Sequence, residues 1–169
     1  MHCPIARLQA DDAPRVLDHL LRLSAEDRSL RFAAGVVTDA AICRYVASIP
    51  FDRDLVLGLV SQRGLVFGLV HGCAFAVRGS RHVEAAFSVD APWRGRGLAT
   101  QLMLALRARL ASDIDDNGAI VATCAARNLP MRSVFGHAGM TLSRIEDEIH
   151  AHCHVAPARV ATILRASAA

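Results

Sequence analysis

The stretch from Val89 to Thr100 reads VDAPWRGRGLAT, and most of the fold can be worked out from it. An apolar strand leads into it, glycines stand at positions 95 and 97, and leucines then recur every fourth residue. Glycines leave a turn free of side chains, so that consecutive backbone N–H groups can curl around an anion. The first amides of the following helix and its dipole add to that attraction. The stretch therefore predicts a strand, an anion-binding turn and an amphipathic helix.

The turn differs from two common phosphate-binding motifs. It lacks the G-x-x-x-x-G-K-[ST] spacing of nucleoside triphosphate loops, and the chain has no lysine to supply that contact, since all 19 cations are arginine. It also lacks G-x-G-x-x-G followed by an acidic residue about 20 positions later. Glycines can also shape such a turn for purely geometric reasons. The residues alone therefore leave a structural turn and a diphosphate cradle both open.

Upstream of the turn, the pattern predicts helices and then strands. Capping residues and apolar spacing indicate three helices, and aliphatic runs separated by turn residues indicate an antiparallel meander of three strands. The helices are expected from Asp11 or Asp12 to about Leu23, over Ala25–Phe32, and from Thr38 to Pro50; the strands are expected over Leu55–Val60, Leu65–Val77 and His82–Val89.

Downstream of the turn, the pattern predicts a strand, a helix and a final strand pair after the long helix that begins near Leu98. These elements are expected over Ala119–Cys124, from Pro130 to Gly139, and over Met140–Ile145 and Glu148–Val155. The fold class is therefore α+β, a mixed α/β domain with a mostly antiparallel sheet flanked by helices. Residues 157–169 are expected to form a helical tail whose apolar stripe suits docking on the body or on a second copy, as in a homodimer.

Composition narrows the class of protein further. The chain has 169 residues, of which 53% are hydrophobic and 21% charged, which excludes a disordered or low-complexity protein and suits one domain over residues 1–169. A net charge of +3 is too small to indicate nucleic-acid binding, and the longest charge-free run is too short to span a membrane. The five scattered cysteines argue against a disulfide framework and favour a reducing, cytoplasmic location.

The motif Arg94-Gly95-Arg96-Gly97-Leu98-Ala99, preceded by an aliphatic strand and Pro92, resembles the [R/Q]-x-x-G-x-[G/A] signature of the GNAT superfamily of acyl-CoA-dependent N-acyltransferases. A second family signature resembles the run from Asn128 through Phe135 to Gly139-Met140. The predicted element order also resembles the GNAT fold over nearly the whole chain. The segments Leu23–Phe32 and Pro50–Asp54 are similar to the branch that contains bacterial protein lysine acetyltransferase domains.

The resemblance implies acetyl-CoA as the acetyl donor and an amine as the acceptor, with direct transfer, no covalent enzyme intermediate and no metal. The pyrophosphate of the coenzyme is expected on the backbone of the turn, the pantetheine arm along the preceding strand, and Asn128 on the far side. The implied coenzyme-binding residues are Phe87, Ser88, Val89, Arg94, Gly95, Arg96, Gly97, Leu98, Ala99, Thr100, Asn128 and Phe135.

Glu84 is the candidate general base. An attacking amine must lose a proton, so a carboxylate or histidine near the thioester is needed, often acting through water. Glu84 is the only acid in the otherwise apolar run Val83–Val89, where burial would make it a stronger base. Members of the family often hold a glutamate at this strand position. The other interpretation is a surface glutamate that faces solvent.

Phe135 departs from the family pattern. A tyrosine near this position often protonates the departing thiolate, whereas the single tyrosine of this chain is Tyr45, in an early helix. Ser133, Cys124 or an ordered water could take that role, or the thiolate could leave unassisted. The substitution is equally compatible with a second hypothesis, a GNAT-like module that binds or senses acyl-CoA without turnover.

Three histidines alternate near the C-terminal end: His150, His152 and His154. In a strand they would all point to one face, where imidazoles could bind zinc or nickel. Because one strand alone supplies them, a solvated or interface face is the favoured interpretation, and no metal site is predicted.

Overall fold

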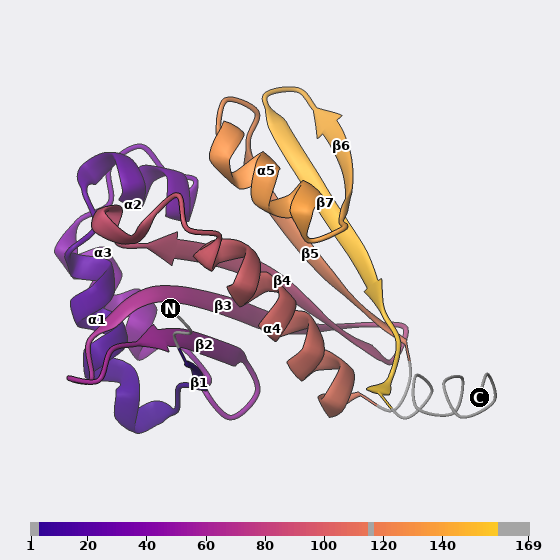
Figure 1. Ribbon diagram of the computed structural model, residues 1–169, viewed down its shortest axis with the longest axis horizontal. Coiled ribbons are helices and arrows are strands. Elements are labelled where there is room, and N and C mark those ends of the chain that lie inside the picture. Colours follow the sequence, from indigo (N-terminus) through magenta and orange to yellow (C-terminus); the bar gives the residue numbers. More distant parts are fainter. Residues whose placement is uncertain (1–3, 115–116, 159–169) are drawn as a thin grey trace.

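The computed structural model describes residues 4–114 and 117–158, in which a single twisted sheet is flanked by helices on both faces (Figure 1). The predicted α+β class is confirmed. The helical tail expected over residues 157–169 lies, beyond Ala158, outside the described residues. Within the described ranges, no helix is long and apolar enough to cross a membrane.

The second and third helices begin at the capping residues that the sequence predicts, whereas Asp12, the N-cap of the first helix, makes no side-chain cap hydrogen bond. Ser24 accepts a hydrogen bond from the backbone of Asp27 at the start of the second helix, and Thr38 does the same for Ala41 in the third. Such side-chain caps satisfy backbone N–H groups that have no partner within the helix. The helices are α1 (Ala13–Leu21), which follows a short 3₁₀ turn at Ala10–Asp12, α2 (Ala25–Phe32) and α3 (Asp39–Ala47).

The seven strands form one sheet in the order β1-β2-β3-β4-β5-β7-β6. The predicted meander is present as β2–β3–β4, and the final hairpin as β6–β7. All neighbours are antiparallel except β4 and β5, which run parallel. The strands are β1 (Ile5–Arg7), β2 (Leu55–Val60), β3 (Val66–Val77), β4 (Ser80–Val89), β5 (Gly118–Ala125), β6 (Thr141–Ile145) and β7 (Glu148–Val155).

The two parallel strands soon part. Their pairing covers only three positions, from His82 opposite Ala119 to Glu84 opposite Val121. Beyond that point β4 stays paired with β3 as far as Val89, and β5 stays paired with β7. Beyond these positions, the edges of β4 and β5 that face each other have no strand partner among residues 4–114 and 117–158, and the two strands diverge in a V.

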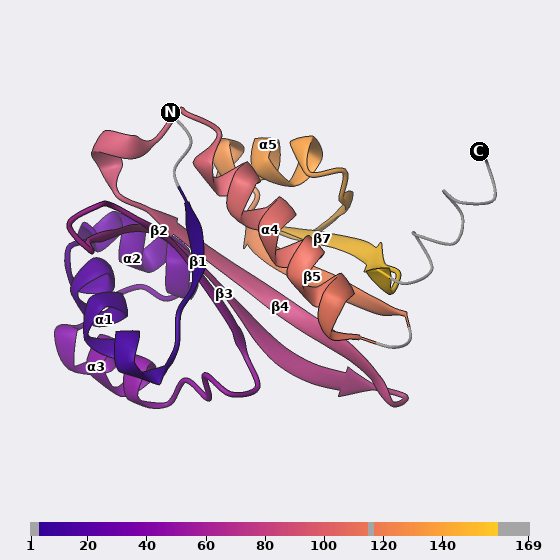
Figure 2. The same cartoon turned by 60° about the horizontal axis from the view of Figure 1, so that its bottom comes forward.

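Each face of the sheet is covered by its own set of helices (Figure 2). On one face α4 (Leu98–Asp113) crosses the strands, and α5 (Leu129–His137) lies beside it. Leu102, Leu106 and Leu110 of α4 are fully buried in this core, together with Phe67 and Phe135. On the other face α1 and α3 close a second core over β2 and β3. This helical layer leaves the far half of that face open.

Candidate functional site

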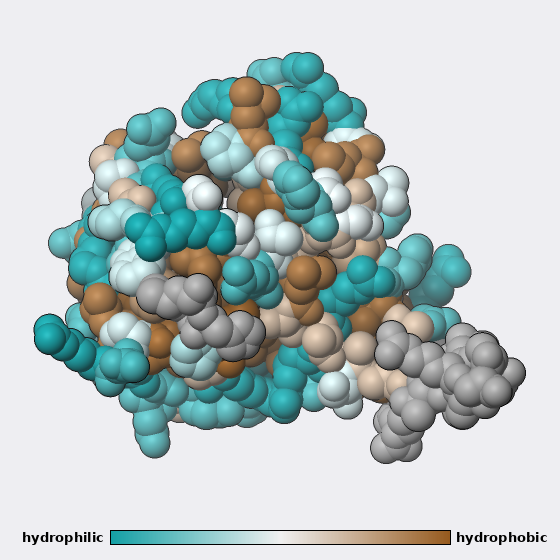
Figure 3. Space-filling view, in the orientation of Figure 1, coloured by the Kyte–Doolittle hydropathy of each residue, from teal (hydrophilic) through white to brown (hydrophobic). Residues whose placement is uncertain are grey.

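A pocket of about 570 Å³ lies where β4 and β5 diverge. Its walls are the exposed edge of β4, the glycine turn with the start of α4, the helix α5, and the N-terminal helix α2. Figure 3 shows that hydrophobic residues are exposed among hydrophilic ones on this face of the molecule. A volume of this size is typical of sites that bury most of a small ligand.

The glycine turn takes the conformation that its sequence predicts. Gly95 and Gly97 both have φ of 72°, in the left-handed region that other residues seldom adopt. Gly97 is also the N-cap of α4, and within the described part of the chain no side chain caps the amides of that helix. The first N–H groups of α4 are therefore open donors at the positive end of a 16-residue helix. Leu98, Ala99 and Thr100 all line the pocket at this point.

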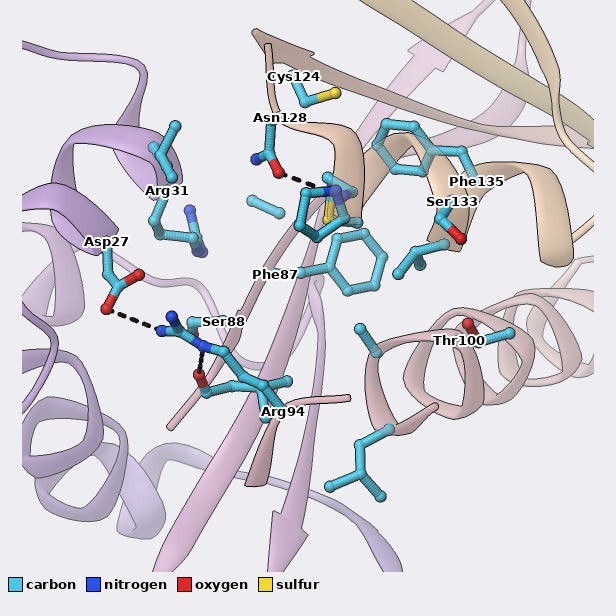
Figure 4. Close-up of a pocket in the computed structure, with 18 of the residues that line it drawn as sticks. Asp27, Arg31, Phe87, Ser88, Arg94, Thr100, Cys124, Asn128, Ser133 and Phe135 are labelled. Carbon is cyan, nitrogen blue, oxygen red and sulfur yellow. Dashed lines mark hydrogen bonds and ion pairs between the residues drawn. The ribbon is translucent and has the colours of Figure 1, made fainter. Parts of the chain in front are cut away.

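Of the two arginines of the turn that were expected at the coenzyme site, one lines the pocket and the other does not. Arg94 lines the pocket, but its guanidinium pairs with Asp27 of α2 at 2.8 Å and donates to the Val89 carbonyl at 2.9 Å (Figure 4). Arg96 does not line the pocket: it lies over the Trp93 ring and donates to the Pro92 carbonyl. The arginines therefore brace the turn and attach it to α2.

The Asp27 carboxylate is held in its charged form. Its partial burial would raise the pKa, but hydrogen bonds from Arg94 and Ser24 outweigh that effect, so the pKa lies below its usual value. An aspartate that is charged and paired in this way is a poor proton acceptor. Asp27 is thus a structural link between α2 and the turn rather than a candidate base.

The open edge of β4 supplies the floor of the pocket. The pocket is lined by five consecutive residues of this strand: Ala85, Ala86, Phe87, Ser88 and Val89. Because β3 pairs with the opposite edge of β4, the edge that faces the pocket is free of other described strands over this range. Backbone N–H and C=O groups on an unpaired edge are available to an extended ligand that carries amides. The expected pantetheine-binding residues Phe87, Ser88 and Val89 are therefore on the wall that could hold such an arm.

A buried trio ties β4 to α1. The Ser88 hydroxyl lies 2.8 Å from Nε2 of His19, and Nδ1 of His19 lies 3.0 Å from an Asp90 carboxylate oxygen. The second contact is off the best hydrogen-bond direction, so its attraction is chiefly electrostatic. Arg22 pairs with the other Asp90 oxygen at 2.9 Å. Because His19 is fully buried and Ser88 is only 9% exposed, we assign the trio to holding α1 against the end of β4.

Residues of β5 and α5 form the opposite wall. Asn128 lines the pocket, and its side-chain oxygen accepts a hydrogen bond from the Met131 backbone, which caps α5. Phe135 also lines the pocket and has no group that could donate a proton. Cys124 lies nearby, and burial raises the pKa of its thiol, which is therefore protonated at neutral pH. That state makes Cys124 a poor nucleophile.

Glu84 lies at the apex of the V and is exposed, so its expected burial is wrong. Its neighbours Val83 and Ala85 point into the core beneath α4, so Glu84 points to the other face of the sheet. The helical layer does not extend over that position. Glu84 is not among the residues that line the pocket, whereas Ala86 and Ser88, which follow it on the same strand face, are.

Sequence reasoning missed the contribution of α2 to the pocket. Asp27, Leu30 and Arg31 line it, together with Leu23 just before the helix. The signal that could have found them is spacing: positions 27, 30 and 31 follow the i, i+3, i+4 rule and share one face of the predicted helix.

The three alternating histidines do share one face of β7. His152 lies opposite Val121, which lies opposite Glu84, and residues directly opposite in a sheet point to the same side. His150 lies 3.4 Å from Glu148, and the His152 and His154 rings contact each other edge to face. Among residues 4–114 and 117–158 there is no group of three or more ligands arranged to hold a metal ion.

The Asp90 contacts generate a prediction about stability. Burial would raise the Asp90 pKa, but the contacts with His19 and Arg22 outweigh it, so the pKa lies below its usual value. The charged form therefore stabilises the native state above about pH 4, and this stabilisation is lost as the pH falls through the lowered pKa. Asp90→Asn should lower the free energy of unfolding by about 1–3 kcal/mol near neutral pH, and acidification should narrow that difference. Urea unfolding at several pH values measures both.

Asp39→Asn is the matched control for this measurement. Asp39 also pairs with an arginine, Arg28, but its side chain is 73% exposed, so the loss should stay below about 1 kcal/mol. Equal losses in the two variants, or an Asp90→Asn loss that does not depend on pH, would contradict the role given to Asp90.

The comparisons with known proteins bear on this arrangement. The sequence model of a family described as "Acetyltransferase (GNAT) domain" matches residues 5–141. No curated protein matches the chain. Among solved structures, the GNAT domain of S. lividans PAT is similar with a TM-score of 0.72 and 21% identity, over 89% of each chain.

Two further solved structures share the fold. A GNAT superfamily phosphinothricin acetyltransferase from Sinorhizobium meliloti, in complex with AcCoA, has a TM-score of 0.70 and 15% identity, over 92% of this chain and 90% of its own. Spermidine N-acetyltransferase from Vibrio cholerae, in complex with CoA and spermine, has a TM-score of 0.64 and 12% identity, over 90% of this chain and 94% of its own. With the family match extending over most of its length, from residue 5 to residue 141, the chain belongs to the GNAT acetyltransferase family.

Proposed function

We propose that this protein is an acetyl-CoA-dependent N-acetyltransferase that transfers the acetyl group directly to an amine. One observation carries the proposal: the open edge of β4 leads straight to uncapped amides at the N-terminus of α4. A ligand with an extended, amide-containing arm that ends in a diphosphate fits this arrangement, because the arm can pair with the backbone of β4 while the diphosphate binds the amides of α4. Structures of two family relatives described above contain AcCoA or CoA, which supports the same donor here.

In this proposal the diphosphate binds the backbone amides between Gly95 and Thr100, where the helix dipole favours an anion. The pantetheine arm runs along Phe87–Val89 and pairs with the free backbone groups of β4. Asn128 and Phe135 close the pocket from α5. Arg94 acts indirectly, because its guanidinium is already paired with Asp27.

Glu84 remains the proposed general base, from an exposed position. The acceptor amine attacks the thioester carbon, a C–N bond forms, and the C–S bond breaks with its electron pair leaving on the sulfur as the coenzyme A thiolate. The proton lost by the amine passes to Glu84 through water. Glu84 is the last β4 residue paired with β5, beside the inner end of the pocket. An acceptor amine that approaches from the open face of the sheet would therefore lie close to the Glu84 carboxylate.

The second candidate function is a module that binds acyl-CoA without turnover. Phe135 favours it, because this buried side chain lines the pocket at the position where the family often has a tyrosine that donates the proton. Ser133 lines the same wall and offers a hydroxyl in its place. A cytoplasmic location belongs to the proposal as well, since the four described cysteines are free.

The cradle can be tested by adding charge without disturbing the fold. Thr100 lies in the first turn of α4, where an acidic side chain interacts favourably with the helix dipole, so Thr100→Glu should fold normally. Its carboxylate would repel a diphosphate, and we expect the affinity for acetyl-CoA to fall at least tenfold, by about 1.4 kcal/mol or more. Calorimetric titration measures this.

Thr100→Gln is the control, since it has a similar size without the charge and should lose much less affinity. If Thr100→Glu binds acetyl-CoA as tightly as the wild type, the diphosphate does not lie at the start of α4.

The role of Glu84 separates the two candidate functions. Glu84→Gln should retain acetyl-CoA binding, because residue 84 does not line the pocket, and should lose about 100-fold or more in kcat, since general bases contribute about that much. The measurement is release of the coenzyme thiol in the presence of acceptor amines. Full turnover in Glu84→Gln would remove this residue from the mechanism, and binding without turnover in the wild type would favour the sensing module.

A further inference from the structure

Arg31 is the charged residue of the pocket that its surroundings leave uncompensated, and we propose that it binds a carboxylate of the acceptor. This inference rests on the proposed acetyltransferase function and assigns its acceptor to a chemical class: a small amine that also carries a carboxylate, as an α-amino acid does. Figure 4 shows Arg31 on the α2 side of the cavity, across from Thr100 at the start of α4.

The charges that line the pocket do not balance. The pocket lining contains the carboxylate of Asp27 and the guanidinium groups of Arg31 and Arg94, besides His137. Asp27 and Arg94 neutralise each other at 2.8 Å. Among the residues that the structure describes, no carboxylate pairs with Arg31. A partly buried guanidinium without a counter-ion attracts an anionic group of a ligand.

The hydrogen-bonding groups of Arg31 are only partly satisfied by the described residues of the protein. One terminal nitrogen, Nη2, donates to the Tyr45 hydroxyl at 2.8 Å. Its Nε–H is shielded from solvent and has no hydrogen-bond partner within residues 4–114 and 117–158. A guanidinium presents its N–H groups in a planar fork that matches the two oxygens of a carboxylate.

The position of Arg31 is fixed by a buried chain of hydrogen bonds. The Tyr45 hydroxyl that accepts from Arg31 also contacts Nδ1 of His71 at 2.5 Å, and Nε2 of His71 lies 2.7 Å from the Asp54 carboxylate. Asp54 is 1% exposed and also accepts from the Ala74 backbone. Burial lowers the His71 pKa, so the imidazole is neutral and can donate to Asp54 while it accepts from Tyr45.

Aromatic contacts complete this support. The Arg31 guanidinium carbon lies 5.1 Å from the centre of the Phe32 ring and 5.5 Å from that of Tyr45. Such contacts hold the cation without neutralising it. A side chain held in this way loses little conformational entropy when it binds a ligand.

The acceptor would meet Arg31 and Glu84 on one side of the sheet. His71 lies opposite Ala86, two residues along from Glu84 on the same face, and the Arg31–Tyr45–His71 chain rises from that face. The carboxylate end of the acceptor can therefore lie at Arg31 while its amine faces the inner end of the pocket. A polyamine lacks the anionic group that Arg31 needs, and the lining offers it no unpaired carboxylate.

The test compares amines that differ only in the carboxylate. Purified protein is supplied with acetyl-CoA and either the proteinogenic α-amino acids or carboxylate-free amines, namely 3-methylbutylamine and tyramine (the decarboxylated forms of leucine and tyrosine) and spermidine. Thiol release gives kcat/KM for each. We expect the better acceptor of leucine and tyrosine to exceed its decarboxylated form by about 10- to 100-fold, the effect of one charge-assisted contact.

Arg31→Gln should abolish most of that ratio, through a rise in KM, and Arg31→Lys should restore part of it. Arg44→Gln, which removes an exposed arginine of α3 away from the pocket, should leave the ratio unchanged. Binding of acetyl-CoA to the wild type is measured separately by calorimetry, so that failure of the proposed function is recognised independently.

The carboxylate assignment is overturned if only carboxylate-free amines are acetylated, or if acids and their decarboxylated forms react equally well. It is also overturned if Arg31→Gln keeps the wild-type ratio, or if acetyl-CoA binds and no amino acid reacts. In the first three cases the acetyltransferase proposal itself survives.

Discussion

The parting of β4 and β5 after Glu84 and Val121 is the constraint on which the rest of the site depends. Each strand keeps its outer partner, so the sheet remains continuous while two inner edges lose theirs. Backbone groups on such edges need other partners, and a ligand with amide groups can provide them. Because β4 continues through a short 3₁₀ helix at Ala91–Trp93 and the glycine turn into α4, the same divergence places helix amides beyond the end of the open edge.

The N-terminal helices are held to this arrangement by charged contacts across long stretches of sequence. Asp27 meets Arg94 at the turn, and Arg22 and His19 meet Asp90 at the end of β4. These contacts hold α1 against the end of β4 and α2 against the turn, so that α2 forms one wall of the pocket. The contact with Asp27 also explains why a motif arginine faces a carboxylate of the protein. With Arg94 so engaged, the proposed anion binding at the turn relies on backbone amides, and among the described residues no carboxylate pairs with Arg31 in the cavity.

Much of the fold could be predicted from the sequence, because local signals agree with the final contacts. The caps at Ser24 and Thr38, the leucine spacing of α4 and the two glycines with positive φ all have local causes. The short strand β1 was missed, since three residues carry too little periodicity. The predicted burial of Glu84 was wrong for a physical reason. The alternation of side chains along a strand indicates that Glu84 and its neighbours face opposite sides of the sheet, but the side that is buried depends on where the helices pack. The Arg31–Tyr45–His71–Asp54 chain joins four separate segments and has no signal in any one of them.

The central claim is that the divergent strands and the α4 amides bind an acyl-CoA. The most direct measurement is calorimetric titration of acetyl-CoA into the purified protein, with desulfo-CoA and ATP as comparison ligands. The account predicts one site per chain with a dissociation constant on the order of 10 μM or lower, retained by desulfo-CoA and absent for ATP. If acetyl-CoA does not bind, or if ATP binds equally well, the open edge and the glycine turn are not a coenzyme site and the account is contradicted.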